Sequence, residues 1–130
     1  MGLFKKIFAA SSGSIEEKVL PWIALTTIEQ LDGILKNSKK RPQIIFKYST
    51  RCGISRVVLK EFERDNLVLE NYFDFYFNDL IKFRNVSNHI ASQFNIRHQS
   101  PQLMVIKNGE VISHSSHGSI NDVDLKNLMK

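Results

Sequence analysis

QIIFKYSTRCGIS, residues 43–55, joins a predicted strand to a predicted helix through a polar loop. The first part, Gln43–Tyr48, is an apolar run rich in β-forming residues, which is typical of a strand buried in the middle of a sheet. The polar segment Ser49–Gly53 then predicts a loop. The helix that follows is expected to end near Asp65 or Asn66. Its apolar positions are Val57, Val58, Leu59 and Phe62.

On the N-terminal side of this stretch, the sequence predicts one strand and one helix. The extended run Leu20–Leu25 suits a short edge strand, because Pro21 disfavours helix before it and fits the start of an edge strand. Thr26 and Glu29 form a capping box, and the apolar spacing after them predicts a helix over residues 27–37.

On the C-terminal side, the apolar patterns predict two further helices and three further strands. They are the strand Tyr72–Phe77, the helix Arg84–Phe94, the strands Leu103–Lys107 and Val111–Ser115, and the helix Ile120–Met129. Asn108-Gly109 predicts a tight hairpin between the last two strands, because both turn positions need positive φ. The order β-α-β-α-β-α-β-β-α predicts an α/β fold, with a mixed central sheet flanked by helices.

Composition narrows the class of protein. A chain of 130 residues is about one domain, and 42% hydrophobic with 24% charged residues is typical of a globular protein. The net charge of +5 is modest, and its longest basic run, Lys39-Lys40-Arg41, is expected to be a solvated turn. We therefore expect no nucleic-acid partner. No apolar run approaches the roughly 18 residues of a membrane span, so we expect no stable membrane insertion.

The first 19 residues differ from the rest. They begin MGLFKKIFAA and lack the longer apolar core of a signal peptide. Two interpretations stay open: a flexible end that leads into Ser11–Ser14, or a short basic amphipathic helix that touches a membrane or a partner. We expect a flexible or amphipathic segment over residues 1–19 and one domain over residues 20–130.

Cys52 is the single cysteine, which excludes an internal disulfide and a cysteine-based structural zinc site and favours a cytoplasmic location. It lies where the loop meets the predicted helix, and there the first-turn N–H groups and the helix dipole favour a thiolate. Arg51 and Arg56 add positive charge, and Gly53 leaves room for a substrate. These features predict a reactive thiol; the alternative is a buried structural cysteine.

Ser55 stands three residues after Cys52, where a dithiol motif has its second cysteine. A hydroxyl cannot form a disulfide, so Cys52 must act alone. Ser55 could donate a hydrogen bond to the thiolate, or it could be an ordinary residue of the first helical turn. A second signal is Ser100-Pro101 before the hairpin. If this peptide bond is cis, the turn faces the cysteine loop and leaves the Ser100 backbone free to pair with an extended substrate; a trans loop is the alternative.

The four histidines do not predict a metal site. His114 and His117 are three residues apart at a predicted strand end, and His89 and His98 flank the end of a predicted helix. No acid or cysteine stands at ligand spacing, so solvated or locally hydrogen-bonded histidines are expected.

Four segments, in this order, resemble the YtxJ family of monothiol bacilliredoxins within the thioredoxin-like proteins. They are Cys52-Gly53-Ile54-Ser55, Arg84-Asn85-Val86-Ser87-Asn88-His89-Ile90-Ala91, His98-Gln99-Ser100-Pro101-Gln102 and Ser116-His117-Gly118-Ser119-Ile120. Together with Leu20-Pro21-Trp22 they extend the resemblance over about residues 20–129. Gly53, Gln99 and Gly118 stand where that family has Pro, Glu and Trp, which bears on the choice of thiol ligand.

The resemblance implies a thioredoxin-like fold and a cytoplasmic thiol–disulfide oxidoreductase. Cys52 would take bacillithiol from a protein mixed disulfide and pass it to a second bacillithiol. The implied partners are bacillithiolated client proteins and this low-molecular-weight thiol, which is a co-substrate; no bound cofactor is expected. The catalytic residues would be Cys52 and Ser55. The substrate-binding residues would be Thr50, Arg51, Gly53, Arg56, Ser100, Pro101 and Gln102.

Three alternatives remain open. Cys-Gly-Ile-Ser is close to the Cys-Gly-Phe-Ser of monothiol glutaredoxins, which carry a [2Fe–2S] cluster between two subunits, but His114–Gly118 replaces their Gly-Gly…Asp segment. Arg56 fits the Cys-Gly-x-Ser-Arg pattern of arsenate reductases, which place the cysteine near the chain start. The chain could also be a non-catalytic thioredoxin-like binding or stress module.

Overall fold

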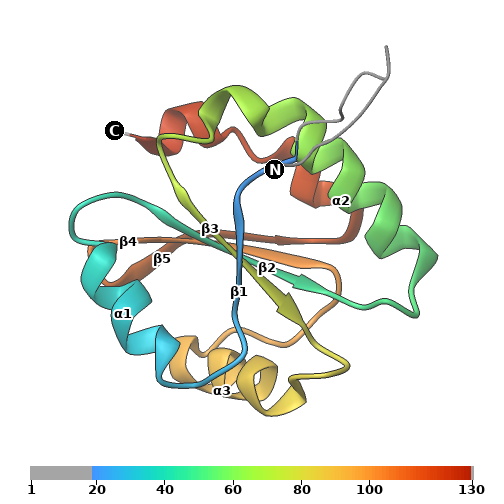
Figure 1. The fold of residues 1–130 in the computed structure, drawn as a ribbon, viewed down its shortest axis with the longest axis horizontal. Coiled ribbons are helices and arrows are strands. Elements are labelled where there is room, and N and C mark those ends of the chain that lie inside the picture. Colours follow the sequence, from blue (N-terminus) through green and yellow to red (C-terminus); the bar gives the residue numbers. More distant parts are fainter. Residues whose placement is uncertain (1–18, 130) are drawn as a thin grey trace, which may run out of the picture.

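The computed structural model describes residues 19–129, so the predictions for residues 1–18 lie outside the described part. Its centre is a five-stranded sheet in the order β1-β3-β2-β4-β5 (Figure 1). The first three strands are parallel, β4 is antiparallel to β2, and β5 is antiparallel to β4. The strands are β1 (Trp22–Ala24), β2 (Gln43–Tyr48), β3 (Asp74–Asp79), β4 (Gln102–Lys107) and β5 (Glu110–Ser116). The predicted mixed α/β sheet is confirmed.

Helical segments cover both faces of the sheet (Figure 1). On one face lie α1 (Gln30–Asn37) and α3 (Arg84–Phe94), and their apolar side chains pack on Ile45, Met104 and Ile106. On the other face lie α2 (Gly53–Asn66) and three short 3-10 segments. These are η2 (Leu67–Leu69), η3 (His117–Asp122) and η4 (Leu125–Met129).

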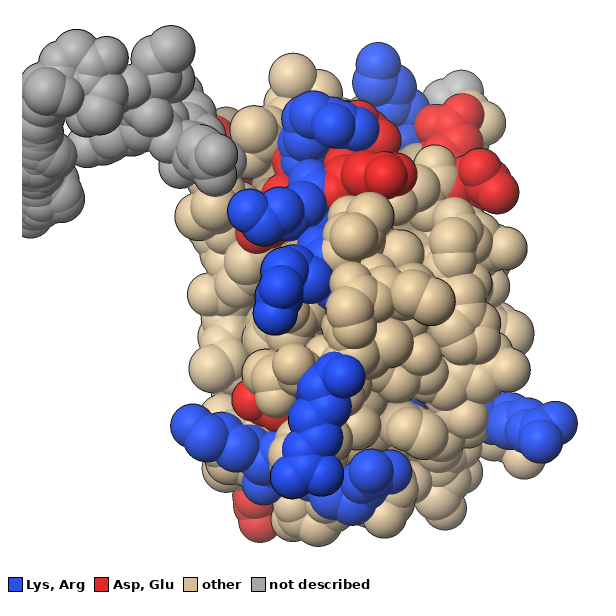
Figure 2. All heavy atoms as spheres, turned by 90° about the vertical axis from the view of Figure 1, so that its right-hand side faces the viewer, with Lys and Arg blue, Asp and Glu red and all other residues tan. Residues whose placement is uncertain are grey.

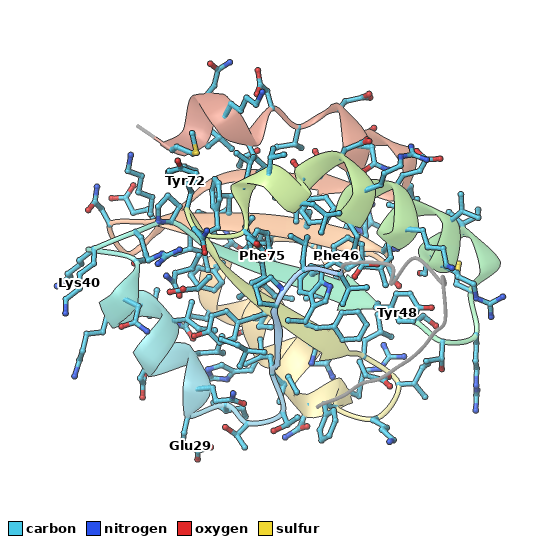
Figure 3. The ribbon with its side chains drawn as sticks, turned by 45° about the horizontal axis from the view of Figure 1, so that its top comes forward. Glu29, Lys40, Phe46, Tyr48, Tyr72 and Phe75 are labelled. Atoms are coloured by element: carbon cyan, nitrogen blue, oxygen red, sulfur yellow. The ribbon has the colours of Figure 1, made fainter. Side chains whose placement is uncertain are left out.

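Side chains alternate along β2, as a strand covered on both faces requires. Ile44 and Phe46 belong to the core cluster under α2, whereas Ile45 belongs to the cluster under α1 and α3. Figure 3 shows Phe46 and Phe75 between the sheet and the segments above it. Lys47 is two residues after Ile45 in the strand, so its side chain points to the same face, which α3 covers, and it is fully buried there.

The hairpin forms as predicted. Asn108 and Gly109 have φ values of 53° and 79°, which are the positive angles that a tight two-residue turn requires. The predicted bounds of β2 and α3 also agree with the structure, and β4 begins one residue earlier than predicted. The predicted β3 starts too early, because the Tyr72 amide donates to the Leu69 carbonyl (3.0 Å) and closes a turn there.

The capping box of α1 lies one residue later than predicted. The Gln30 amide donates to Thr27 Oγ1 (3.3 Å), and the Thr27 amide donates to Gln30 Oε1 (3.0 Å). Thr27 and Gln30 therefore satisfy each other's backbone donors, as a capping box does, in place of Thr26 and Glu29. α1 itself is regular from Gln30 to Asn37, so it starts three residues after the predicted position.

The predicted last helix, Ile120–Met129, is wrong. The chain forms two 3-10 segments instead, separated at Val123, which is extended (φ −75°, ψ 125°). Side-chain hydrogen bonds fix each segment separately. Asp124 Oδ1 accepts from the Lys126 amide (3.2 Å) at the start of η4, and Asn121 Nδ2 of η3 donates to the Val58 carbonyl of α2 (3.3 Å). The break lets Ile120 and Leu125 both reach the core under α2.

Candidate active site

Cys52 is the N-cap residue of α2. Its backbone is extended (φ −107°, ψ 116°), and its amide donates to the Ser49 carbonyl (3.2 Å). Ser49 also folds the loop through its side chain, because its hydroxyl accepts from the Arg51 amide (3.3 Å). The free thiol of Cys52 is partly exposed at the end of the helix where unpaired N–H groups point outward.

The first turn of α2 lowers the pKa of the Cys52 thiol below its ordinary value. The Ser55 backbone N–H is the largest cause, followed by the Ser55 hydroxyl; partial desolvation opposes them, and the Ile54 N–H adds a smaller lowering. The Ser55 side chain is 0% exposed, and its hydroxyl has no hydrogen-bond partner among residues 19–129. A hydroxyl without a partner can still turn and donate to a Cys52 thiolate.

The proline turn reaches the same edge of the sheet as the cysteine loop. The β2–β4 register pairs Lys47 with Gln102, so the chain leaves the sheet after Tyr48 and enters it after Pro101 side by side. The Ser100–Pro101 bond is cis, and the Pro101 carbonyl accepts from the His117 amide (3.0 Å). Within residues 19–129, the Ser100 amide and carbonyl make no backbone hydrogen bond.

The other site residues predicted from the sequence divide into two groups. Thr50, Arg51, Gly53 and Arg56 are exposed around Cys52, and a side chain at Gly53 would meet open space. Gln102 is buried instead, and its Nε2 donates to the Arg97 carbonyl (3.0 Å). Its side chain thus braces the loop before the proline turn and does not face solvent.

The surface beside the thiol combines apolar and basic side chains. Ile54 and Val57, both in the first turns of α2, are each 58% exposed. Figure 2 shows the right-hand side of Figure 1, where the start of α2 lies, and Lys and Arg side chains follow one another down this face. Acidic side chains gather on its upper part. Among residues 19–129, no three His, Cys, Asp or Glu side chains are grouped so that they could hold a metal ion.

Sequence analysis missed a polar cluster around the buried Lys47, next to the segment that leads to the proline turn. Lys47 is 0% exposed, and its Nζ donates to the Ser87 carbonyl (3.1 Å) and lies 3.3 Å from His98 Nδ1. Burial, with a smaller effect of the nearby Arg84 charge, lowers the pKa of Lys47 to about 8. The available signal was a lysine inside an otherwise apolar strand, but the sequence did not indicate its partners.

A mixed five-stranded sheet, with a cysteine at the start of the helix after β2 and a proline turn at the same sheet edge, defines the thioredoxin-fold class. Solved structures agree. One, a protein with a thioredoxin fold and a suggested oxidoreductase activity, is 28% identical (TM-score 0.72) and matches 84% of this chain and 94% of its own. Thioredoxin from Fasciola hepatica is 17% identical (TM-score 0.62), and the match covers 82% of this chain and 94% of that thioredoxin. Thioredoxin from Trypanosoma brucei brucei is 13% identical (TM-score 0.66), and the match covers 89% of this chain and 97% of that thioredoxin.

The chain belongs to the monothiol bacilliredoxin BrxC family, whose family model matches residues 23–125. The expected resemblance to monothiol bacilliredoxins is therefore confirmed, and the chain is a thiol–disulfide oxidoreductase of the thioredoxin fold. In the described part of the chain, none of the helices combines the length and the apolar character needed to cross a bilayer.

Proposed function

We propose that Cys52 is the nucleophile and that the protein removes bacillithiol from mixed disulfides on cytoplasmic client proteins. The Cys52 thiolate attacks the bacillithiol sulfur, the client thiolate leaves, and a Cys52–bacillithiol disulfide forms. A second bacillithiol thiolate then attacks the bacillithiol sulfur of this disulfide. It releases the Cys52 thiolate and bacillithiol disulfide, so one free bacillithiol is consumed for each client thiol released.

The observation that carries the proposal is the setting of Cys52. Its sulfur is partly exposed, its pKa is lowered by Ser55, and the residue at the resolving position has only a hydroxyl. A low thiol pKa raises the fraction of nucleophilic thiolate at neutral pH. A site with one thiol can exchange disulfides with a partner but cannot complete the cycle without a second thiol molecule.

The surroundings of Cys52 suit the two ends of such a substrate. Ile54 and Val57 offer an exposed apolar contact for a client protein, and the free backbone of Ser100 can pair with an extended client segment. On the same side, Thr50, Arg51, Gly53 and Arg56 would meet the sugar and acid groups of the thiol. Pro101 would hold the Ser100 backbone in the position where it pairs with the client segment.

Intact-mass spectrometry tests the transfer step. Reduced protein is mixed with a bacillithiolated client, and in parallel with a glutathionylated one. We expect a bacillithiol adduct on Cys52 with release of the client thiol, little adduct from glutathione, and none in Cys52→Ser. Arg56→Ala should slow transfer from bacillithiol severalfold, whereas Arg64→Ala, an exposed arginine at the other end of α2, should not.

Transfer from neither client, with Cys52 still open to alkylation, would contradict the proposal. A brown colour and charge-transfer absorption after anaerobic purification would then favour cluster carriage. Unchanged thiol chemistry in cells that carry Cys52→Ser would favour a non-catalytic binding module.

A further inference from the structure

A polar cluster of the buried Lys47 and Ser87 and the half-buried His98 joins three separate segments near the candidate active site. Lys47 belongs to β2, which leads to the Cys52 loop; Ser87 belongs to α3; and His98 belongs to the irregular segment 95–100, which leads to the proline turn. Lys47 Nζ donates to the Ser87 carbonyl (3.1 Å) and lies 3.3 Å from His98 Nδ1, and Ser87 Oγ lies 3.1 Å from the same ring nitrogen.

This geometry fixes the protonation of His98. An ammonium group only donates hydrogen bonds, so His98 Nδ1 must be the acceptor. The ring is then neutral and carries its proton on Nε2. A second proton on Nδ1 would point an N–H group at the Lys47 ammonium and would break that contact, whereas the Ser87 hydroxyl can donate to or accept from this nitrogen. The contact with Lys47 is therefore made only by the neutral form of His98.

The charges around His98 act in the same direction. Burial is the largest cause that lowers its pKa below the ordinary value, and the Lys47 and Arg84 cations follow. The polar side chains that β3 and β4 contribute here are the amides of Asn78 and Gln102, and neither amide carries a charge. Both charged groups that act on His98 are cations, so no carboxylate compensates a proton on the ring.

His98 lies two residues before Ser100, in a segment with few other attachments. Gln102 Nε2 holds the Arg97 carbonyl (3.0 Å), and the Ile96 amide donates to the Ala91 carbonyl (3.0 Å) at the end of α3. Beyond these bonds, the packing of Ile96 on the core and the contacts of His98 with Lys47 and Ser87 fasten the segment to the sheet and to α3. Pro101 is held independently, because its carbonyl accepts from the His117 amide (3.0 Å), so losing the His98 contacts would loosen the Ser100 side of the turn relative to Cys52.

We propose that His98 is a positioning residue: in its neutral form it anchors the segment 95–100 on Lys47 and Ser87, and so holds the Ser100–Pro101 turn where a client segment must pair, until acid protonates the ring. The inference rests on the proposed role of Cys52 as nucleophile. It predicts that acid slows transfer from a protein client more than it slows the reaction of Cys52 with a small alkylating reagent, which needs no turn.

The test compares these two rates between about pH 5 and 8 in wild type, His98→Asn and His98→Ala. Asparagine places an oxygen acceptor near the position of Nδ1 and does not titrate. We expect the ratio of client transfer to alkylation to fall with acid in wild type and to stay level in His98→Asn. In His98→Ala the ratio of client transfer to alkylation should be about tenfold lower than in wild type at every pH tested, because the substrate site is misplaced. His89→Asn, an exposed histidine of α3, should behave as wild type.

The same client is used for every variant, so its own pH dependence cancels between wild type and His98→Asn. The proposal is overturned if His98→Asn keeps the acid dependence of wild type, or if His98→Ala transfers normally. Nitrogen-15 NMR of the ring supplies a readout without turnover: the Nε2–H tautomer is expected, and the Nδ1–H tautomer would overturn the proposal. If no variant transfers bacillithiol at any pH but the Nε2–H tautomer and an acid-induced loss of amide protection in residues 95–100 are observed, the proposed function fails while the anchor stands.

Discussion

At the scale of single residues, Ser55 offers Cys52 two hydrogen-bond donors, of which only the hydroxyl can be removed by substitution. In Ser55→Ala we expect the thiol pKa to rise, because the thiolate loses one donor while the backbone N–H remains. The rate of alkylation should then fall severalfold at neutral pH but match wild type at high pH, where every thiol is ionised. Stopped-flow alkylation against pH measures both limits.

A control for this substitution is Ser92→Ala, which removes an exposed hydroxyl from α3 on the other face of the sheet. It should leave both rates unchanged. Equal neutral-pH rates in Ser55→Ala and wild type would mean that the helix backbone alone sets the thiol pKa. A lowered rate at high pH as well would point to a distorted site and not to a pKa effect.

The two candidate residues that sequence analysis found are close neighbours in the chain. Cys52 and Ser55 share one helical turn, so their relation follows from local geometry. Lys47 and His98 are 51 positions apart and meet only because β2 lies between β3 and β4 and α3 covers that face. No periodicity in the sequence encodes this contact, so the cluster of Lys47, Ser87 and His98 could not be predicted from the sequence.

At the scale of elements, the start of α2 accepts a proline at Gly53. The space around a Cβ there is open, and Cys52 before it has the extended backbone that a following proline demands. Proline suits the first helical position, where the N–H has no intrahelical partner. The N–H groups that lower the thiol pKa belong to Ile54 and Ser55, so none of them is lost.

Gly53→Pro should therefore stabilise the protein by about 0.4–1 kcal/mol, because it removes freedom from the unfolded chain. For a chain of this size that is a rise in Tm of roughly 2–4 °C, seen by calorimetry or circular dichroism. Gly53→Ala separates the loss of glycine freedom from the effect of the ring. A lower Tm in Gly53→Pro would show that the N-terminus of α2 needs a conformation that proline cannot adopt.

Helices and strands could be predicted from the sequence where a local pattern had one structural interpretation and no competing one. The Asn108-Gly109 turn and the apolar run of β2 each had a single interpretation, and both are confirmed. The last helix failed because its apolar spacing fits a helix, whereas Asn121 and Asp124 bond to backbone groups and split it. The Asn121 bond depends on the position of α2, which the local sequence does not contain, whereas the Asp124 bond is local.

At the scale of the whole molecule, one sheet separates two apolar clusters. Trp22, Phe46, Phe62 and Phe75 lie on the α2 face, and Trp22 Nε1 donates to Glu63 (2.8 Å). Its ring centroid is 5.6–6.1 Å from those of three phenylalanines of this cluster. Ile90 lies in the other cluster, under α3. Because β2, β3 and β4 contribute side chains to both faces, neither cluster can open without disturbing the other.

Ile90→Ala should consequently lower the stability of both faces together. The side chain is 0% exposed, so the expected loss is about 2–5 kcal/mol in the free energy of unfolding. Trp22 is the only tryptophan, and its fluorescence reports the opposite face. In a denaturant titration its transition should shift with that of far-UV circular dichroism and coincide with it, as one cooperative unit requires. Ile54→Ala, an exposed control, should shift neither by more than about 0.5 kcal/mol. If circular dichroism fell before the Trp22 transition in Ile90→Ala, the α3 face would open by itself, and the proline loop attached to it could move without unfolding of the half that carries Cys52.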